Sequence, residues 1–240
     1  MPGAAMIRWD ETGTPIAARF DDPYFSRRDG RAETRHVFIA GNDLTTRFLA
    51  ADRFHIAELG FGTGLNFLET LLHWKAYARL RESPPPHLVY TAFERYPLSH
   101  AACLQALSHW PDLLTEGGIF LKEIAAADVN REMRHGSVTL RLIVGDANVT
   151  IDGLTQPVDA WYLDGFSPAK NPELWNESLM RAVAEKTMPG GTFATYTAAG
   201  WVRRMLAGAG FRVTRTKGYG TKRHMSTGIK QTEDKATASA

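Results

Sequence analysis

The chain has 240 residues, 44% of them hydrophobic, and its formal net charge is only +2. This length suits a single α/β domain with a full core and leaves no room for a second large catalytic domain. The one cysteine, Cys103, excludes an internal disulfide and a cysteine-rich zinc site, and no apolar run approaches about twenty residues. We therefore expect a cytoplasmic protein without a membrane segment, in which Cys103 is a small core residue.

The first fifty residues are rich in turn formers. Residues 7–16 have the pattern of a hairpin closed around Thr12 and Gly13, and residues 44–48 have that of a short helix. We expect residues 1–50 to form a small β appendage packed on a core of residues 51–228. Residues 229–240 lack periodic apolar side chains and are expected to be a disordered tail or a linker remnant.

The most informative motif is the glycine-rich stretch 58–66, Glu-Leu-Gly-Phe-Gly-Thr-Gly-Leu-Asn. An apolar strand (54–57) precedes it and leucines at helical spacing follow it, as in a strand, loop and helix that hold a nucleotide-like ligand. The spacing differs from the dinucleotide fingerprint, and the loop has no Lys or Arg for a pyrophosphate. The motif therefore favours S-adenosylmethionine, although a plain tight turn is the alternative.

Acidic residues follow four successive predicted strands. The strand before the glycine loop ends at Glu58, and strands over 87–93, 138–144 and 158–163 lead to Glu94, Asp146 and Asp164. A doubly wound sheet binds its ligand outside these carboxyl ends. We expect Glu58 to bind the methionine ammonium group, Glu94 the ribose hydroxyls and Asp146 the adenine amino group. Glu94 has a second interpretation, as the cap of the next helix.

The last third of the chain predicts an antiparallel ending. A fifth strand over 190–196 and a helix over 199–208 are followed by a hairpin of 211–214 and 222–225, so we expect a Rossmann-like, mainly parallel sheet of the class I methyltransferase type. No Asp or Glu occurs between Lys186 and Thr232, although many Lys and Arg do. This basic end is either a solvated face or a surface for a polyanion such as RNA.

Four stretches together resemble a known family. Residues 22–26, 58–66, 164–175 and 218–225 are similar to the MnmC/MnmD tRNA methyltransferases, and the likeness extends over about residues 7–228. It implies transfer of a methyl group from S-adenosylmethionine to 5-aminomethyl-2-thiouridine at the tRNA wobble position, in the anticodon loop. His224 departs from the family, whose members often carry Glu at this position.

In many bacteria this methyltransferase is joined to an FAD-dependent oxidoreductase that removes a carboxymethyl group. This sequence has no flavin fingerprint, so we expect a stand-alone methyltransferase or one domain of a longer protein, with neither FAD nor a metal. An FAD oxidoreductase domain or enzyme that acts upstream is the expected pathway partner.

The predicted chemistry needs a base near the substrate amine, and Asp164 is placed to accept its proton. Phe166 is expected beside the methyl group or the uracil ring, or alternatively as a lid without specific contacts. Trp175 is either a core anchor or a ligand contact, and Tyr24 and Glu33 are candidate contacts from the appendage. His36, His55 and His73 are expected at the surface.

We thus predict three groups of site residues. The catalytic residues are Asp164 and Phe166. The donor-binding residues are Glu58, Gly60, Phe61, Gly62, Gly64, Asn66, Glu94, Asp146, Ala147 and Asp164. The tRNA-binding residues are Tyr24, Arg203, Arg204, Lys222 and Arg223. The alternatives are a methyltransferase of a small amine or of another nucleobase, an aminopropyl transferase, and a non-catalytic RNA-binding module.

Overall fold

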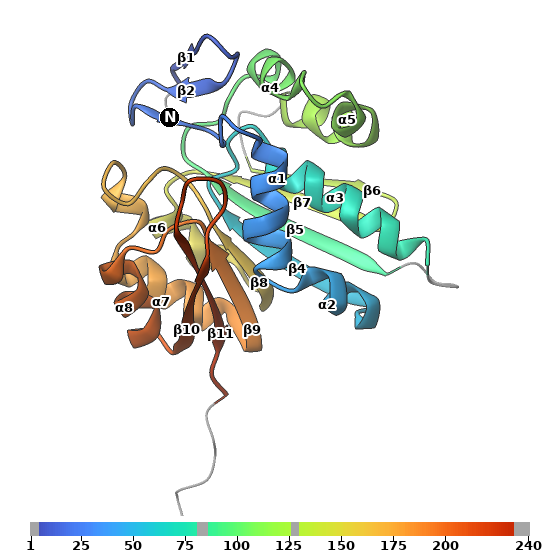
Figure 1. The fold of residues 1–240 in the computed structure, drawn as a ribbon. Helices are drawn as coiled ribbons and strands as arrows, with labels where there is room; N and C mark the ends of the chain where they lie inside the picture. The colour runs from blue at the N-terminus through green and yellow to red at the C-terminus, as the bar shows by residue number, and fades with distance from the viewer. Residues whose placement is uncertain (1–4, 81–85, 126–129, 233–240) are drawn as a thin grey trace, which may run out of the picture.

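The computed structural model describes residues 5–80, 86–125 and 130–232. Within these ranges the main sheet has eight strands in the order β10-β11-β9-β8-β4-β5-β7-β6 (Figure 1). The five strands from β9 to β7 are parallel, while β10, β11 and β6 run antiparallel to their neighbours. This topology confirms the predicted fold class. The strands are β4 (Arg53–Leu59), β5 (His87–Glu94), β6 (Arg131–His135), β7 (Val138–Val144), β8 (Val158–Leu163), β9 (Thr187–Thr195), β10 (Phe211–Lys217) and β11 (His224–Lys230).

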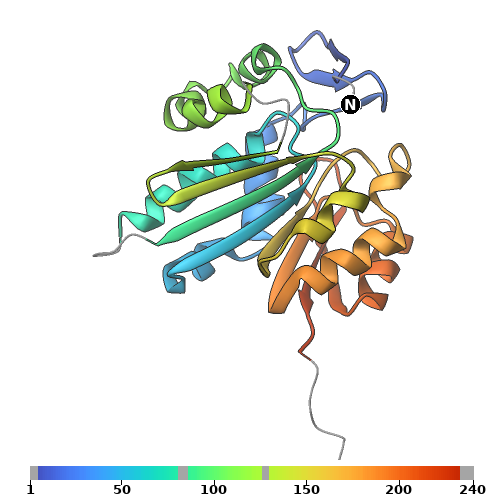
Figure 2. The same cartoon turned by 180° about the vertical axis from the view of Figure 1, so that it is seen from behind.

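Helices cover both faces of this sheet (Figures 1 and 2). Side chains alternate along each strand, so β4 buries Phe54 and Ile56 in one hydrophobic cluster and Ala57 and Leu59 in the other. The first cluster includes α2 (Leu44–Ala50), α3 (Leu65–Ala78) and α5 (Pro111–Ala125). The second includes α6 (Ala147–Thr150), α7 (Glu177–Lys186) and α8 (Gly200–Gly208). The short α4 (His100–Leu107) packs against α5.

The N-terminal segment forms its own small sheet. Strands β1 (Ile7–Trp9), β2 (Pro15–Ala17) and β3 (Asp22–Pro23) pair in sequence order. The predicted hairpin around Gly13 is confirmed, and Gly13 has a φ of 78° in its turn. The carboxylate of Asp10 accepts hydrogen bonds from the backbone N–H groups of Thr12 and Thr14, which closes the turn.

A helical segment between this sheet and α2 was not predicted. Helix α1 (Gly30–Thr34) continues into the π-helical segment η1 (Arg35–Ala40), and Asp29 caps it by accepting from the N–H of Ala32. Val37, Phe38 and Ile39 are buried in the main core. Residues 30–50 therefore cover the main sheet, and only the residues before them make up the separate small sheet. Helices α5 and α7 and edge strand β6 were also missed from the sequence.

The C-terminal hairpin differs from the prediction in its second strand. We expected residues 222–225 in this strand and a tail from residue 229, but β11 runs from His224 to Lys230, and Lys222 and Arg223 lie in the loop. Gly228 explains the error, because a glycine in a strand pattern indicates a break. Here a Cβ on Gly228 would lie 2.2 Å from the ring of Phe193, so the glycine makes room for that ring. Residues 233–240 lie outside the described part of the chain.

Of the three histidines expected at the surface, His55 is buried instead. Its ring bonds to the carbonyl of Pro157 and to the hydroxyl of Thr91, which satisfies both nitrogens. Burial lowers the pKa of His55 to about 4, so this imidazole is neutral. Side chains alternate along β4, so His55 lies on the same face as the buried Ala57. The sequence pattern therefore indicated that this position is buried. Cys103 is buried, as expected.

Candidate active site

The register of the parallel strands brings the predicted acidic ends to one edge. Leu59 of β4 is level with Phe93 of β5 and with Leu163 of β8, and Glu94 is level with Val144 of β7. The glycine loop, Glu94 and the turns at Asp146 and Asp164 therefore follow the sheet at neighbouring positions. This is the edge where open α/β sheets bind their ligands.

The glycine loop needs its glycines. Gly60, Gly62 and Gly64 have φ values of 86°, 54° and 81°, a region that L side chains rarely adopt. A Cβ on Gly60 would lie 3.0 Å from the backbone of Gly165, and one on Gly62 would lie 3.1 Å from the ring of Tyr24. The loop is thus fitted closely between the turn after β8 and the N-terminal segment.

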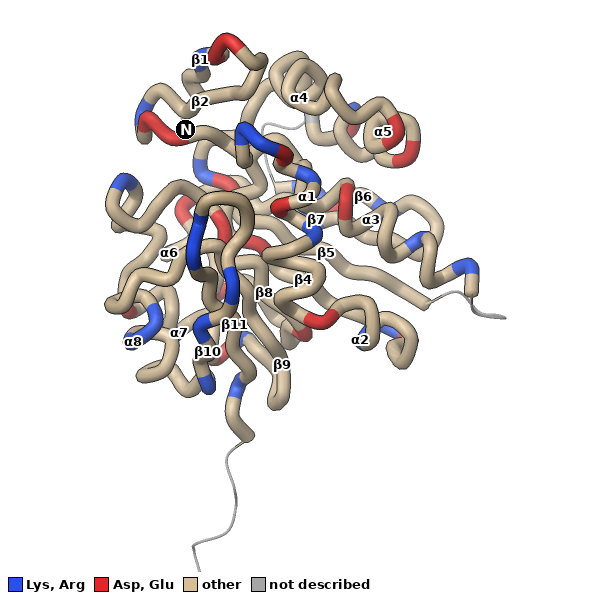
Figure 3. Tube along the Cα trace, in the orientation of Figure 1, with Lys and Arg blue, Asp and Glu red and all other residues tan. Residues whose placement is uncertain are grey.

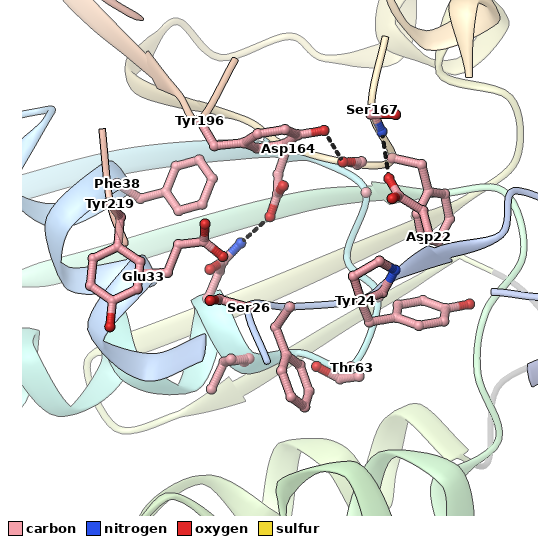
Figure 4. Close-up of a pocket in the computed structure, with 18 of the residues that line it drawn as sticks. Asp22, Tyr24, Ser26, Glu33, Phe38, Thr63, Asp164, Ser167, Tyr196 and Tyr219 are labelled. Atoms are coloured by element: carbon pink, nitrogen blue, oxygen red, sulfur yellow. Dashed lines mark hydrogen bonds between the residues drawn. The ribbon is translucent and has the colours of Figure 1, made fainter. Parts of the chain in front are cut away.

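These segments enclose a cavity of about 500 Å³. Its walls are the glycine loop, the turn 164–167 after β8, residues 22–28 of the N-terminal segment and the loop 219–222 between β10 and β11. Figure 4 shows side chains from all of these segments around it. Asp22 joins two of the walls, because its carboxylate accepts from the N–H of Ser167 at 2.9 Å.

Asn66 links two acidic groups at the base of the cavity. Its Nδ2 donates to Glu58 Oε1 at 2.7 Å and to Asp164 Oδ2 at 2.6 Å, and its Oδ1 accepts from the Thr34 hydroxyl. Asn66 and Asp164 line the cavity. Glu58 is fully buried behind them and also accepts from the hydroxyl of Tyr90, so its carboxylate orients Asn66 and does not face the cavity.

Asp164 is the acidic group best placed for proton transfer. Burial, with a contribution from the negative charge of Glu33, raises its pKa to about 7, against the opposing effects of Asn66 and Lys222. A carboxylate with a pKa near neutrality both holds and releases a proton at physiological pH. Burial and the charge of Asp164 also raise the pKa of Glu58 well above its usual value.

Glu94 meets the glycine loop from β5. Its two carboxylate oxygens accept from the N–H of Gly62 at 2.9 Å and from the N–H of Tyr96 at 2.7 Å. The backbone N–H groups of Arg95 and Phe61 also act on this carboxylate and, like those of Gly62 and Tyr96, oppose the rise in its pKa that burial causes. The alternative role as a helix cap is wrong, because Ser99 caps α4 by accepting from the N–H of Ala102.

Asp146 and Ala147 lie beside a second, smaller cavity of about 60 Å³, which shares Glu94 with the first. Asp146 caps α6 through the N–H of Asn148 and lies 3.0 Å from the guanidinium of Arg95. Its carboxylate therefore already has protein partners in this structure.

Phe166, in the turn after β8, packs against other aromatic residues. Phe166 lines both cavities and stacks on Phe20, with 4.6 Å between ring centroids, while Tyr24 meets it edge-on at 5.1 Å. Trp175 is buried, and its Nε1 donates to the carbonyl of Phe166 at 2.9 Å. Trp175 is thus the core anchor of this loop, the first of its two predicted roles.

Of the predicted donor-binding residues, Gly60, Phe61, Gly62, Asn66, Glu94 and Asp164 line the larger cavity, and Glu58 and Gly64 do not. Tyr24 and Lys222 also line it, whereas Arg203, Arg204 and Arg223 do not. Figure 3 shows Lys and Arg along α8, β10 and β11.

Sequence reasoning missed three lining residues that matter for the cavity's charge and shape. Arg28 follows the Asp22–Ser26 motif, Tyr196 comes directly after β9, and Tyr219 lies in the hairpin loop. Tyr196 was detectable, because the strand-end argument that selected the carboxylates applies equally to an aromatic residue at the end of the fifth strand.

Over the described ranges, no three His, Cys, Asp or Glu side chains gather in a way that would hold a metal ion. No helix within the same ranges is both long enough and apolar enough to span a bilayer.

Comparison with known proteins fits this geometry. A family model described as S-adenosyl-L-methionine-dependent methyltransferase matches residues 119–231. The crystal structure of MNMC2 from Aquifex aeolicus superposes with a TM-score of 0.73 at 22% identity, covering 94% of this chain and 70% of that one. Spermidine synthase from Thermotoga maritima gives 0.52 at 11% identity, covering 95% and 73%. The family match, which lies in the C-terminal half of the chain, agrees with the resemblance read from the sequence.

Proposed function

We propose that this chain methylates the amino nitrogen of 5-aminomethyl-2-thiouridine at the wobble position of tRNA, with S-adenosylmethionine as donor. The observation that supports it most directly is Asp164, a carboxylate with a pKa of about 7 in the wall of a cavity that also holds the glycine loop. The substrate itself is inferred from the sequence resemblance to the MnmC/MnmD enzymes.

The residues of the cavity fit the donor. Glycines with positive φ let the backbone approach a ligand closely, and Gly60 and Gly62 of this loop both line the cavity. Glu94 lines the cavity beside the glycine loop, where its carboxylate is proposed to accept from the ribose hydroxyls, and Asn66 and Asp164 offer further polar groups in the same cavity. When bound, S-adenosylmethionine supplies a methyl group on a sulfonium centre that needs no further activation.

The protein then has to supply an unprotonated amine in the right position. An alkylamine is mostly protonated at neutral pH, and its lone pair becomes available when the proton moves to Asp164. The Asn66 N–H group steadies the carboxylate at 2.6 Å. Closely packed aromatic rings, Phe166 among them, limit water beside the reacting groups.

The proposed partner is the anticodon loop of tRNA. Lys and Arg on α8 and on the C-terminal hairpin, including Arg203, Arg204 and Arg223, are proposed to contact its phosphates. These contacts position the RNA, while the wobble base enters the cavity. Turning a base out of a single-stranded loop costs only a few kcal/mol.

The experiment measures methyl transfer from labelled S-adenosylmethionine to two tRNAs, followed by nucleoside mass analysis. One tRNA carries 5-aminomethyl-2-thiouridine and the matched control carries 2-thiouridine without the aminomethyl group. The proposal expects 5-methylaminomethyl-2-thiouridine from the first and no product from the second. Donor binding without this product rejects the tRNA assignment, and methylation of small amines instead supports the alternative enzyme.

A further inference from the structure

One cation in the cavity lies where an alkylammonium ligand would be expected. The Nζ of Lys222 is 2.9 Å from a carboxylate oxygen of Glu33 and 4.1 Å from the centre of the Tyr196 ring. An acidic group beside an aromatic face is a recognised way to bind an ammonium group, because both attract the same positive charge. All three side chains line the cavity.

The acid and the ring are fixed more firmly than the cation. Glu33 belongs to α1 and its side chain is 13% exposed, while the Tyr196 hydroxyl donates to the carbonyl of Gly165 at 2.9 Å. The Lys222 side chain is 44% exposed and extends from the hairpin loop. Within the described residues, its ammonium group has no hydrogen-bond partner other than Glu33. A lysine side chain on a loop is therefore the part of this trio that can leave.

This position adjoins the proposed base. Asp164 lines the same cavity, and the charges of Glu33 and Lys222 act on its carboxyl group in opposite directions. In Figure 4 the side chains of Glu33 and Asp164 point into the same part of the cavity. An ammonium group held by Glu33 would thus be next to the carboxylate that takes its proton.

We propose that Glu33 and Tyr196 form the subsite for the alkylammonium group of the substrate, and that Lys222 occupies this subsite until the substrate displaces it. The inference rests on the proposed function only in taking an alkylamine as the substrate. The exchange of one ammonium for another keeps Glu33 paired throughout, so the partly buried carboxylate is never left alone.

The exchange also selects the substrate. A wobble uridine without an amine has no cation to replace Lys222 at Glu33. A precursor whose amine still carries a carboxymethyl group brings its own carboxylate toward Glu33 and Asp164 and is repelled. The subsite therefore favours the free aminomethyl group over both, which makes Glu33 a specificity-determining residue.

The test measures binding rather than turnover. With S-adenosylhomocysteine present so that no methyl group is transferred, the dissociation constants are determined for tRNA with 5-aminomethyl-2-thiouridine and for tRNA with 2-thiouridine. Both tRNAs make the same phosphate contacts, so the ratio of the two dissociation constants measures the contribution of the amine alone. For the wild-type protein we expect a preference of at least about tenfold for the amine, the size of one hydrogen-bonded charge pair.

Glu33→Gln is expected to bring this ratio to about one. Glu185→Gln makes the same charge change at an exposed position on α7 away from the cavity and should keep the wild-type ratio. Lys222→Met removes the resident cation, which competes with the substrate amine, and should raise the ratio. An unchanged ratio in Glu33→Gln overturns the subsite, and a ratio in Lys222→Met that does not rise above the wild-type value overturns the displacement.

Failure of this inference is distinguishable from failure of the proposed function. If the wild-type protein forms the methylated nucleoside but Glu33→Gln keeps the full preference for the amine, the subsite alone is wrong. If the wild-type protein neither methylates the aminomethyl tRNA nor distinguishes the two tRNAs, the substrate assignment of the proposed function is wrong.

Discussion

The side-chain nitrogen of Asn66 donates a hydrogen bond to Oδ2 of Asp164 at 2.6 Å and a second one to Oε1 of the buried Glu58 at 2.7 Å. A single amide group thus holds the carboxylate at the front of the cavity and the one behind it. Because the Thr34 hydroxyl donates to the amide oxygen, the orientation of Asn66 is fixed from both ends.

Asn66→Asp should therefore be strongly destabilising at neutral pH. The change removes both N–H donors and adds a third carboxylate to two that are already close together, and the loss of buried hydrogen bonds to charged groups alone costs about 3 kcal/mol or more. Urea unfolding measures the effect. Asn130→Asp is the matched control, because this exposed asparagine uses its Oδ1 as an acceptor from Val144 and keeps that role as aspartate. Equal stability of the two variants would show that the network contributes little.

Methyl transfer by the wild-type protein should become faster as pH rises through about 7, because the base must be ionised to accept a proton. Asp164→Asn should lower kcat by about a hundredfold or more and remove this rise, with little change in tRNA affinity. Single-turnover rates between about pH 5 and 9, roughly two units on either side of this pKa, check it. A variant with the wild-type rate and profile would exclude Asp164 as the base.

Asp164 should also make stability depend on pH. Its folded-state pKa of about 7 is above the usual 3.8, so the folded protein holds the proton more tightly than the unfolded chain does. The stabilisation is complete below about pH 4 and is lost as pH rises through about 7. Asp164→Asn should not lose stability in this way. Between these pH values its free energy of unfolding should rise relative to that of the wild-type protein by roughly 1 to 3 kcal/mol, a range that is reduced because water in the cavity screens the charge. Parallel stability curves for the two proteins would contradict this.

Glu94→Gln should weaken donor binding by about 10- to 100-fold, the effect of losing hydrogen bonds to a charged group. Calorimetric titration with S-adenosylhomocysteine measures it, and tRNA affinity in the absence of this ligand should stay the same. Unchanged donor affinity would limit Glu94 to holding the N–H groups of Gly62 and Tyr96.

Trp175→Phe should lower the free energy of unfolding and slow methyl transfer, because the carbonyl of Phe166 loses its donor. Trp161→Phe is a close control. Trp161 is equally buried, and its Nε1 has no hydrogen-bond partner among the described residues, so the same truncation removes no hydrogen bond there. The difference between the two variants, about 1 kcal/mol, reports the hydrogen bond itself. No difference would mean that packing alone holds the loop.

Strands β4, β5, β7 and β8 could be predicted from the sequence because they are largely apolar runs that end at glycine or acidic residues. The same pattern located Glu94 and Asp164 at one edge. Residues 30–40 escaped because Arg, Glu and His interrupt their apolar positions, and the burial of Val37 and Phe38 depends on a sheet that forms elsewhere in the chain.

The inner arrangement of the site could not be read from spacing. Both acidic residues were predicted at strand ends, yet Glu58 lies within β4 and behind Asn66, while Asp164 follows β8 and lies in front of Asn66. The pairing of Glu33 with Lys222 joins residues from opposite ends of the chain. No local pattern connects them.

The walls of the cavity include Asp22 near the beginning of the chain and Lys222 near its end. During synthesis, the parallel strands and the glycine loop are complete well before the hairpin of β10 and β11 leaves the ribosome. A growing chain therefore has the base of the cavity before it has the last wall, which the loop between β10 and β11 supplies.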